Sequence, residues 1–293
     1  MLATSPCNGS KGSNSITPSV VHVLPKGNQV GGLTSLGDDV FAVRLKHQQQ
    51  IEVYDAKTFT LQRHIIVPGL GRISFGLTAC PHNNCLYASD WDNDSVHRVE
   101  LSGNNAVMKW SVARDPLGLS VNSEHNLLVV SRSKRKLQIF TTRGTLLQNI
   151  KLQADVQYPR HALQLPTGQF LVSHAGSLHR LCLVGVDGAV VRGCGGQEGS
   201  QLTQMNYPAV LAVDREGRVL VADQCNDRLL VIDQSLSCVH EMSVCVDGGL
   251  KGPRSLWYDQ SRRRLYIGEW DEHKGRVIII DSLEDFSAAQ VQA

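Results

Sequence analysis

The fold of this 293-residue chain is decided by residues 208–233, "PAVLAVDREGRVLVADQCNDRLLVID". Three short apolar runs, at 210–213, 218–223 and 228–233, are separated by the polar turns "DREG" and "QCND". A fourth run, at 238–244, follows the turn "DQSL". Short apolar runs bounded by turn residues predict four consecutive antiparallel strands.

The same unit recurs along the chain. We take as a marker the residue that ends the second run of each unit; the markers are Arg44, Asp90, Arg132, His174, Asp223 and Glu269. Successive markers are 46, 42, 42, 49 and 46 residues apart, which is the period of a four-stranded propeller blade. The sequence therefore predicts an all-β, six-bladed β-propeller of four-stranded antiparallel blades.

Prolines mark the starts of four of the predicted inner strands: Pro116, Pro159, Pro208 and Pro253. A proline at the first position of a strand fixes φ, and the backbone N–H that it lacks is not needed there.

The last blade needs a strand from the other end of the chain. After residues 276–281 no fourth run follows, whereas residues 20–24, "VVHVL", form an unassigned apolar run near the N-terminus. Pairing the two would close the ring and cover an exposed sheet edge. We therefore predict a flexible leader at 1–19, one propeller domain at 20–283 and a tail at 284–293.

Composition sets broad limits on function. The net charge of +2 gives no general attraction to nucleic acid or membranes, so such binding would need a local patch. No apolar run approaches the roughly 20 residues of a membrane span, and the N-terminus lacks the apolar core of a signal peptide. We expect a cytoplasmic protein that does not bind membranes, with its cysteines reduced.

An alternation of acids at Asp90, Asp92 and Asp94 resembles the first half of a calcium loop. That loop also needs a glycine at position 6 and a glutamate at position 12, where this chain has Ser95 and Leu101. The cysteine spacings do not fit a zinc site either. We predict no metal or other cofactor, and interpret the acidic markers as caps of the turns that follow them.

Residues 192–233, "RGCGGQEGSQLTQMNYPAVLAVDREGRVLVADQCNDRLLVID", resemble an NHL repeat. They contain the glycine-rich lead, the aromatic-proline pair Tyr207-Pro208 and the pattern "LAVD…G…LVAD…N.R…V.D". The sixth unit matches more loosely and the first three only in outline. One departure is that Asn226-Asp227-Arg228 stand where the family's name implies Asn-His-Leu.

The resemblance extends to the C-terminal propeller of tripartite-motif (TRIM-NHL) proteins, and it implies a binding platform for protein or single-stranded RNA. In that family the propeller often follows RING, B-box and coiled-coil segments of ubiquitin ligases. No cysteine/histidine cluster or heptad pattern precedes residue 20. Any link to ubiquitin ligases is therefore indirect, or the chain is a fragment of a longer protein.

Our leading expectation is a non-enzymatic platform that binds a protein partner. A more specific version of this expectation is a substrate- or adaptor-recognition module associated with ubiquitin ligases. The alternative is single-stranded RNA binding through a basic patch over blades three and four. That patch is centred on the hairpin "SRSKRK" at residues 131–136. The candidate residues for either partner are Arg114, Arg132, Lys134, Arg135, Lys136, Tyr158, Arg160, His161 and His174.

Several features leave these readings open. Asp115 and Asp155 offset part of the patch, and a solvated hairpin accounts for "SRSKRK" equally well. Blades five and six are expected to present an acidic half formed by Asp223, Asp227, Glu269, Asp271 and Glu272. We expect Tyr158 and Tyr207 to pack between blades, whereas Trp91 and Trp270 fit packing and contact roles equally.

A third reading is a metal-dependent lactonase or esterase, which some six-bladed propellers are. The predicted inner strands carry mostly apolar or small residues, and the chain has no GxSxG, HExxH or Walker-type motif. His161 is the one candidate near the central channel, and it has no partner nucleophile or carboxylate. We therefore predict no catalytic residues and no small-molecule substrate.

Overall fold

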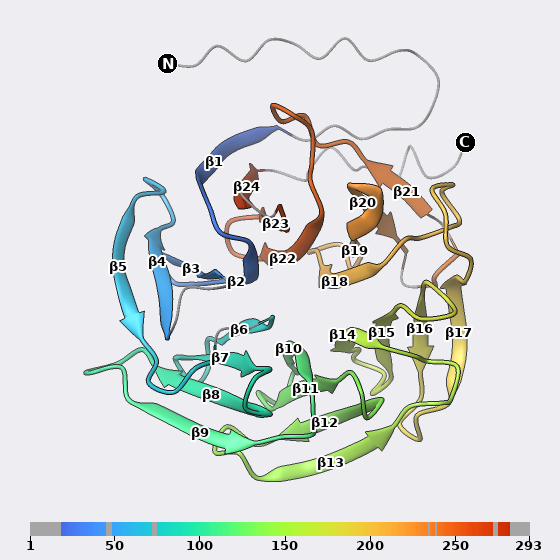
Figure 1. The fold of residues 1–293 in the computed structure, drawn as a ribbon, viewed down its shortest axis with the longest axis horizontal. Coiled ribbons are helices and arrows are strands. Elements are labelled where there is room, and N and C mark those ends of the chain that lie inside the picture. Colours follow the sequence, from blue (N-terminus) through green and yellow to red (C-terminus); the bar gives the residue numbers. More distant parts are fainter. Residues whose placement is uncertain are drawn as a thin grey trace.

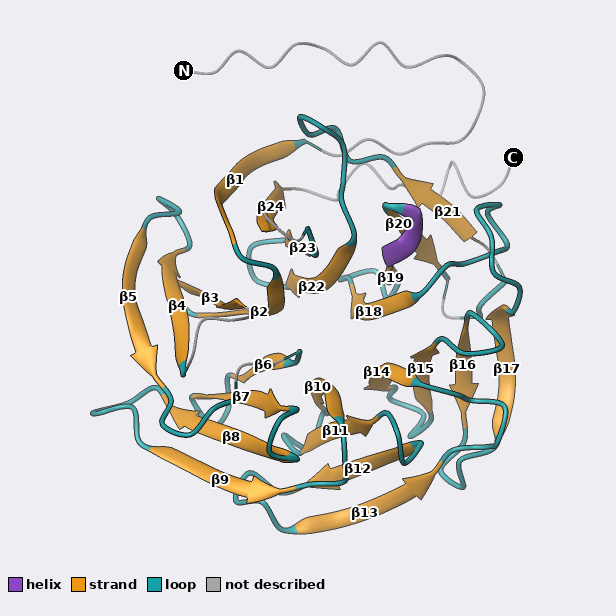
Figure 2. Cartoon of the chain, in the orientation of Figure 1, coloured by secondary structure: helices purple, strands orange, loops and turns teal. Residues whose placement is uncertain are grey.

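The computed structural model describes residues 19–281 except 45–48, 72–74, 234, 238 and 272–274. Its strands form six separate four-stranded antiparallel sheets, and these are arranged as the blades of a ring around a central channel (Figures 1 and 2). The predicted six-bladed propeller is confirmed.

The blades contain the following strands. Blade one has β2 (Val30–Leu36), β3 (Asp39–Arg44), β4 (Gln50–Asp55) and β5 (Leu61–Ile66), and blade two has β6 (Leu77–Cys80), β7 (Cys85–Asp90), β8 (Ser95–Glu100) and β9 (Val107–Ser111). Blade three has β10 (Pro116–Val121), β11 (Leu127–Ser131), β12 (Lys136–Phe140) and β13 (Leu146–Lys151), and blade four has β14 (Pro159–Gln164), β15 (Phe170–His174), β16 (Arg180–Val184) and β17 (Val190–Gly195). Blade five has β18 (Pro208–Val213), β19 (Val219–Asp223), the short 3-10 helix η1 (Gln224–Asn226), β20 (Arg228–Ile232) and β21 (Val239–Met242), and blade six has β22 (Pro253–Asp259), β23 (Arg264–Glu269), β24 (Gly275–Asp281) and β1 (Val20–Gly27).

Burial decreases from the second strand of a blade to its outer edge. Every residue of β7, β11, β15 and β19 is buried, because neighbouring blades cover both faces of these strands. They therefore read as continuous apolar runs instead of an alternation. The outer strands β5 and β13 are mostly exposed. The apolar core lies between blades, as where Phe41 and Val53 of blade one pack with Leu77 and Leu86 of blade two.

All four predicted prolines begin an inner strand: Pro116, Pro159, Pro208 and Pro253. The residue before each of them has a positive φ, from 48° at Tyr158 to 63° at Tyr207. A register shift follows each proline as well. In four blades, the loop that enters the inner strand therefore makes the same sharp turn before the proline.

The predicted closure is confirmed. Strand β1 pairs antiparallel with β24, and Val20, Val23 and Leu24 lie opposite Ile280, Ile278 and Val277. The sixth sheet has the order β1-β24-β23-β22 and so combines the two ends of the chain. The Leu24 side chain is 1% exposed and packs in the apolar core between blades six and one.

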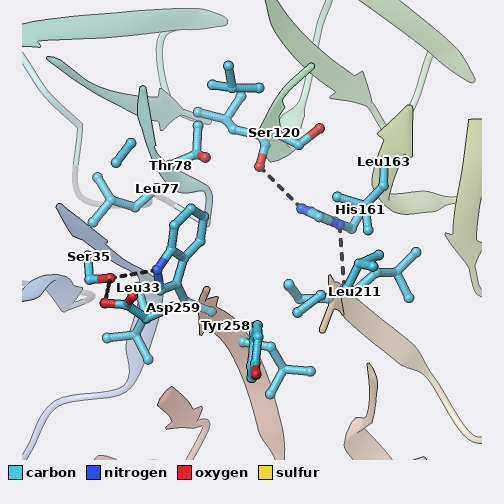
Figure 3. A pocket seen from close by; sticks show the side chains of 18 of the residues that line it. Leu33, Ser35, Leu77, Thr78, Ser120, His161, Leu163, Leu211, Tyr258 and Asp259 are labelled. Atoms are coloured by element: carbon cyan, nitrogen blue, oxygen red, sulfur yellow. Dashed lines mark hydrogen bonds between the residues drawn. The ribbon is translucent and has the colours of Figure 1, made fainter. Parts of the chain in front are cut away.

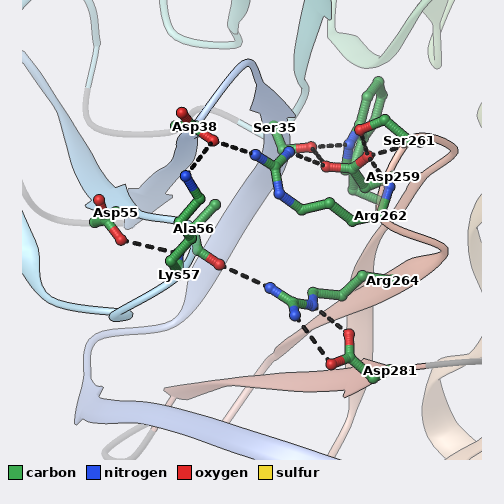
Figure 4. A network of polar contacts seen from close by, with 11 residues as sticks. Ser35, Asp38, Asp55, Ala56, Lys57, Asp259, Ser261, Arg262, Arg264 and Asp281 are labelled. Atoms are coloured by element: carbon green, nitrogen blue, oxygen red, sulfur yellow. Dashed lines mark hydrogen bonds and ion pairs between the residues drawn. The ribbon is translucent and has the colours of Figure 1, made fainter.

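Polar contacts also join blade six to blade one in the same junction (Figure 4). Arg262 donates to Asp38 at 2.7 Å, and Arg264 donates to the carbonyl oxygen of Ala56 at 2.7 Å. Ser35 donates to Asp259 at 2.8 Å in the buried part of the same seam. The last and first blades are therefore connected by both apolar and polar contacts.

The register corrects one marker. Pro116 lies opposite Ser131, as Pro208 lies opposite Asp223 and Pro253 opposite Glu269. Ser131, not Arg132, therefore occupies the marker position of blade three. Arg132 lies one residue further on, where blades two and six have Trp91 and Trp270.

Two further observations bear on the expected compartment. The six cysteines within the described residues are all free thiols. No helix in this part of the chain is long and apolar enough to cross a membrane.

The closure can be tested with Leu24→Ala. We expect the free energy of unfolding to fall by about 2–5 kcal/mol, because the change opens a cavity in the closing core. The matched control is Val21→Ala on the same strand, where the side chain is 42% exposed and a change within about 0.5 kcal/mol is expected. Urea unfolding followed by tryptophan fluorescence measures both. Equal effects of the two variants would show that β1 does not close the ring.

Candidate functional site

The acidic markers are hydrogen-bonded to side chains inside their own blades. Asp90, Asp223 and Glu269 are buried, and each accepts a hydrogen bond from a basic side chain on the third strand of the same blade. The partners are His97 at 3.0 Å, Arg228 at 2.8 Å and Arg276 at 2.6 Å. Burial raises the pKa of the Asp223 carboxyl, whereas at Asp90 the hydrogen bonds from His97 and Asn93 outweigh burial and lower the pKa.

Among the described residues, backbone capping of the following turn is seen in blade two. Asp90 accepts the backbone N–H of Asn93 in the turn that follows it, at 3.2 Å. Asp223 and Glu269 instead accept the N–H groups of Asn206 and Lys251, at 2.7 and 2.9 Å, in the loops that lead into the inner strands. These carboxylates therefore hold hairpin and loop together. Within the described ranges, no group of three histidine, cysteine or acidic residues is placed to hold a metal ion.

His174 occupies the marker position of blade four and is fully buried. Its Nε2 accepts a hydrogen bond from Arg180 at 3.0 Å, and Arg180 also donates to Asp155. Burial and the nearby Arg180 lower the pKa of His174 to about 4, so the ring is neutral. His174 is thus an internal residue and not part of the predicted binding face, and Asp155 is engaged with Arg180 instead of the basic hairpin.

His161 also lies away from the predicted face. It is buried on β14, beside the central channel (Figure 3). Its Nε2 donates to the carbonyl oxygen of Leu119 at 3.2 Å, and its Nδ1 accepts from the N–H of Leu211 at 3.4 Å. Burial lowers its pKa to about 4. With both nitrogens engaged in the neutral ring, His161 is not part of the binding face to which we had assigned it.

The predicted basic hairpin does assemble. Ser131 and Ser133 donate to the carbonyl oxygen of Arg114, at 2.6 and 3.4 Å, which places the Arg114 loop beside the hairpin. Arg135 donates to the carbonyl oxygen of Ala154 in the next interblade loop, at 3.0 Å. Arg114 and Lys134 are exposed, whereas Arg132, Arg135 and Lys136 are partly buried.

The predicted acidic half is weaker than expected. Asp223 and Glu269 are buried in the ion pairs described above. Asp227 lies 3.4 Å from Lys251 and accepts the N–H of Gly252 at 2.6 Å. Glu272 lies outside the described residues. Most of the carboxylates that were to balance the basic patch are therefore already neutralised by neighbours.

A second group of arginines lies on the same face, each against aromatic rings. The centre of the Arg132 guanidinium is 4.8 Å from the Tyr158 ring centroid and 5.9 Å from that of Trp91. The Arg160 guanidinium lies 4.3 Å from the Tyr207 ring. Such distances are those of cation–π contacts.

The third arginine, Arg254, lies between two rings, 4.0 Å from Trp270 and 4.3 Å from Phe75. Phe75 in turn contacts Trp91 edge-on, with the ring centroids 5.5 Å apart. Together these residues form what we call the arginine–aromatic cluster: Phe75, Trp91, Arg132, Tyr158, Arg160, Tyr207, Arg254 and Trp270.

The three arginines of this cluster have no carboxylate partner within the described residues. Arg160 and Arg254 are only 6% and 8% exposed, and the Nε atoms of Arg132 and Arg160 are buried without a hydrogen bond. Burial, aided by repulsion from Arg132, lowers the pKa of Arg160 to about 10. Burial and then Arg160 lower that of Arg254. This is an uncompensated concentration of positive charge, whereas Arg228 bonds two carboxylates and three carbonyl oxygens.

Tyr207 meets the expectation of packing between blades, because its ring lies against Arg160 and His179 of blade four, whereas Tyr158 departs from it. Tyr158 is 50% exposed and lies over Arg132. Tyr158 and Tyr207 both adopt a positive φ, a conformation that is uncommon for a bulky residue. At the same position before the proline, blade three has Asp115 and blade six has Gly252.

Sequence reasoning missed Phe75 and Arg254. The available signal was the dipeptide Pro-Arg, which opens β14 as Pro159-Arg160 and β22 as Pro253-Arg254. The equivalent positions of blades three and five hold Leu117 and Ala209. Both arginines therefore begin inner strands at equivalent places in the ring, close enough for Arg160 to lower the pKa of Arg254.

Fold and face together define a six-bladed, NHL-like propeller with a cationic and aromatic surface. The chain is distantly homologous to the Brain tumor protein of Drosophila melanogaster, with 24% identity over 132 residues. The match covers 43% of this chain and 12% of the length of that protein. This homology confirms the resemblance to TRIM-NHL proteins. The chain matches no known protein-family profile.

Solved structures of low sequence identity share the fold. A streptogramin B lyase superimposes with a TM-score of 0.64 at 11% identity, covering 88% of this chain and 84% of that one. Hydrazine synthase of Kuenenia stuttgartiensis gives 0.61 at 12% identity, covering 88% and 97%. Virginiamycin B lyase of Staphylococcus aureus, with quinupristin, gives 0.63 at 10% identity, covering 85% and 81%. At such identities the likeness shows the fold alone.

Replacing an arginine by methionine should have opposite effects on the free energy of unfolding at an unpaired and at a paired position. Arg160→Met should raise the free energy of unfolding by about 1–3 kcal/mol, because it removes a buried cation that lacks a carboxylate partner. Arg228→Met should lower it by about 3–5 kcal/mol, because it leaves Asp223 buried and unpaired. Urea unfolding curves of the two variants provide the test. A loss of stability in Arg160→Met as large as that in Arg228→Met would make Arg160 a structural residue.

Proposed function

We propose that this protein is a non-enzymatic binding platform whose arginine–aromatic cluster and neighbouring basic hairpin bind single-stranded RNA. The observation that supports this most strongly is the group of three arginines that face aromatic rings and have no carboxylate partner among the described residues. A guanidinium group donates hydrogen bonds in the planar geometry that phosphate accepts.

The balance of charge calls for an anionic ligand. A buried cation without a partner costs free energy, and the mutual repulsion of Arg132, Arg160 and Arg254 adds to that cost. An anion bound between them would offset both terms. Arg114 and Lys134, which are exposed on the adjacent loop and hairpin, extend the positive surface outward over blade three.

The aromatic rings favour RNA over an acidic protein. Single-stranded nucleic acid alternates phosphates with flat bases, and such ligands are bound by aromatic side chains beside a positive groove. Five rings lie among three guanidinium groups here, and the half-exposed Tyr158 is available to a base. An acidic peptide would use the arginines but would leave most of the rings without a matching group. We therefore rank RNA above the protein partner that the sequence had placed first.

The absence of catalysis is part of the proposal. The two buried histidines, His161 and His174, are neutral and hydrogen-bonded within the fold. Neither is paired with a nucleophile activated for acyl transfer, because the thiol beside His174, Cys182, is buried and its pKa is raised to about 12 by burial. These features support a binding role.

Fluorescence anisotropy with a labelled, mixed-sequence single-stranded RNA tests the proposal. We expect binding that weakens about 20-fold between roughly 50 and 200 mM salt, which corresponds to three phosphate contacts at a slope of about −0.7 each. Tyr158→Ala should weaken binding by about 5- to 150-fold if one base stacks on that ring. Arg132→Glu should abolish most of the salt-sensitive binding, because it reverses a charge within the cluster.

The matched control is Arg143→Glu, which makes the same charge change in an exposed turn between β12 and β13, on the opposite face of blade three. It should bind RNA like the wild type. Equal losses of RNA affinity in Arg132→Glu and Arg143→Glu would show that binding depends on the net charge of the protein and not on the cluster. A glutamate-rich peptide that displaces RNA at the same concentration as unlabelled RNA would restore the protein partner to first place.

A further inference from the structure

The opposite end of the central channel contains a cavity of about 770 Å³. It is lined by all six inner strands, β2, β6, β10, β14, β18 and β22. Turn residues between the first and second strands of their blades, among them Gly37, His125 and Pro166, also line it. The cavity therefore opens on the face away from the arginine–aromatic cluster, and Figure 3 shows side chains that line it. Its volume lies within the range of small-molecule sites.

The wall of this channel cavity is mainly apolar. Its lining includes Leu33, Leu77, Leu163, Leu211, Val213 and Trp257. The indole N–H of Trp257 donates to Ser35 at 2.8 Å. The indole polar group is thus occupied, and what this side chain offers a ligand is its ring.

No unpaired charge lines the channel cavity in the described part of the chain. Its charged lining residues are Asp259 and Arg262, which pair with each other at 3.0 Å. Asp259 also accepts from Ser35, and Arg262 reaches Asp38. A charged ligand would therefore lose its hydration without gaining a counter-ion, so the cavity selects against net charge.

Most polar side chains at the wall are also already satisfied. His161 uses both ring nitrogens, and Ser120 donates to the carbonyl oxygen of Ala162 at 2.8 Å. Asn122 donates to Gln164 at 2.8 Å. The hydroxyl of Thr78, by contrast, makes no hydrogen bond to any described residue, and Thr78 lines the cavity. The Thr78 hydroxyl is therefore one of the polar groups that remain for a ligand, beside the side chains of Tyr258 and His125, which also line the cavity.

The far end of the channel cavity is closed by the cluster on the other face. Phe75 lines the cavity and also lies against Arg254 and Trp270. A polypeptide or nucleic-acid strand could not pass through such a blind space. Depth, a closed end and apolar walls together fit a compact small molecule.

We propose that the channel cavity binds an uncharged, largely apolar small molecule, with an aromatic or alicyclic face against Trp257 and one hydrogen-bonding group at the Thr78 hydroxyl. This site is separate from the proposed RNA site and does not depend on it. We propose a binding site and not a catalytic site. His161, which we considered as a catalytic residue at the channel, has both ring nitrogens engaged in hydrogen bonds.

The probe for the test is N-phenyl-1-naphthylamine, a neutral dye with a naphthyl group, a phenyl group and one N–H donor, whose fluorescence rises in apolar sites. We expect saturable binding of one dye per chain to the wild type. Leu163→Trp should weaken it at least tenfold by filling the cavity. Val186→Trp, which adds the same side chain at a position 60% exposed on blade four, should leave it unchanged. Near-ultraviolet circular dichroism confirms that each variant is folded.

A second variant decides the matter if Leu163→Trp does not fold. Thr78→Val keeps the side-chain shape and removes the hydroxyl, so dye binding should weaken about fivefold; unchanged affinity would overturn the assigned hydrogen bond. An absence of saturable dye binding to the wild type, or equal binding by Leu163→Trp and Val186→Trp in their folded states, would overturn the site itself.

The same dye skeleton with a negative charge tests the selectivity. 8-Anilinonaphthalene-1-sulfonate should bind the channel cavity at least tenfold more weakly than the neutral dye. Any sulfonate dye held by the arginine–aromatic cluster should be displaced by RNA, whereas the neutral dye should not be. Displacement of the neutral dye by RNA would place it at the cluster and refute the channel site. Failure of RNA binding alone would leave the dye result unaffected.

Discussion

The rest of the structure depends on the antiparallel pairing of β1 with β24. A propeller blade is stable only when both of its faces are covered by neighbours, and a ring with an open edge would leave one blade half covered and one strand unpaired. Here the first strand of the chain completes the last blade, and Leu24 closes the apolar core between blades six and one. The ion pair between Arg262 and Asp38 crosses the same junction. Every site described above requires this closed ring, because each is built from blades that meet only around the axis.

Two kinds of arginine coexist in this ring. Arg228 and Arg276 follow an acidic marker within their own blades, and their guanidinium groups are saturated by carboxylates and loop carbonyls. They hold hairpins and interblade loops in place. Arg160 and Arg254 follow the entering prolines instead, near the axis, and face only aromatic rings among the described residues. Natural folds rarely keep such groups without compensation, and for this reason we place the proposed RNA site at the second kind.

The central channel is chemically asymmetric. Its end on the hairpin face is cationic and aromatic, whereas its other end is apolar, with its single lining ion pair already satisfied. Phe75 separates the two, touching Arg254 on one side and lining the cavity on the other. The two ends therefore suit ligands of opposite character, one anionic and extended, the other neutral and compact.

The amino-acid sequence by itself determined the strands, the six-blade count, the four proline starts and the closing strand, because these depend on local turn chemistry and on a nearly constant repeat length. It also indicated the basic hairpin around Lys134 and Arg135. Only the tertiary structure decided that Ser131 holds the marker position, since β11 is buried on both faces and its continuous apolar run does not reveal the register. It also decided that His161 and His174 are internal, and that Arg160 and Arg254 meet near the axis beside Phe75 and Trp270. Burial and charge compensation depend on which blades face each other across the ring, and residues so far apart in the chain become neighbours only once the ring has closed.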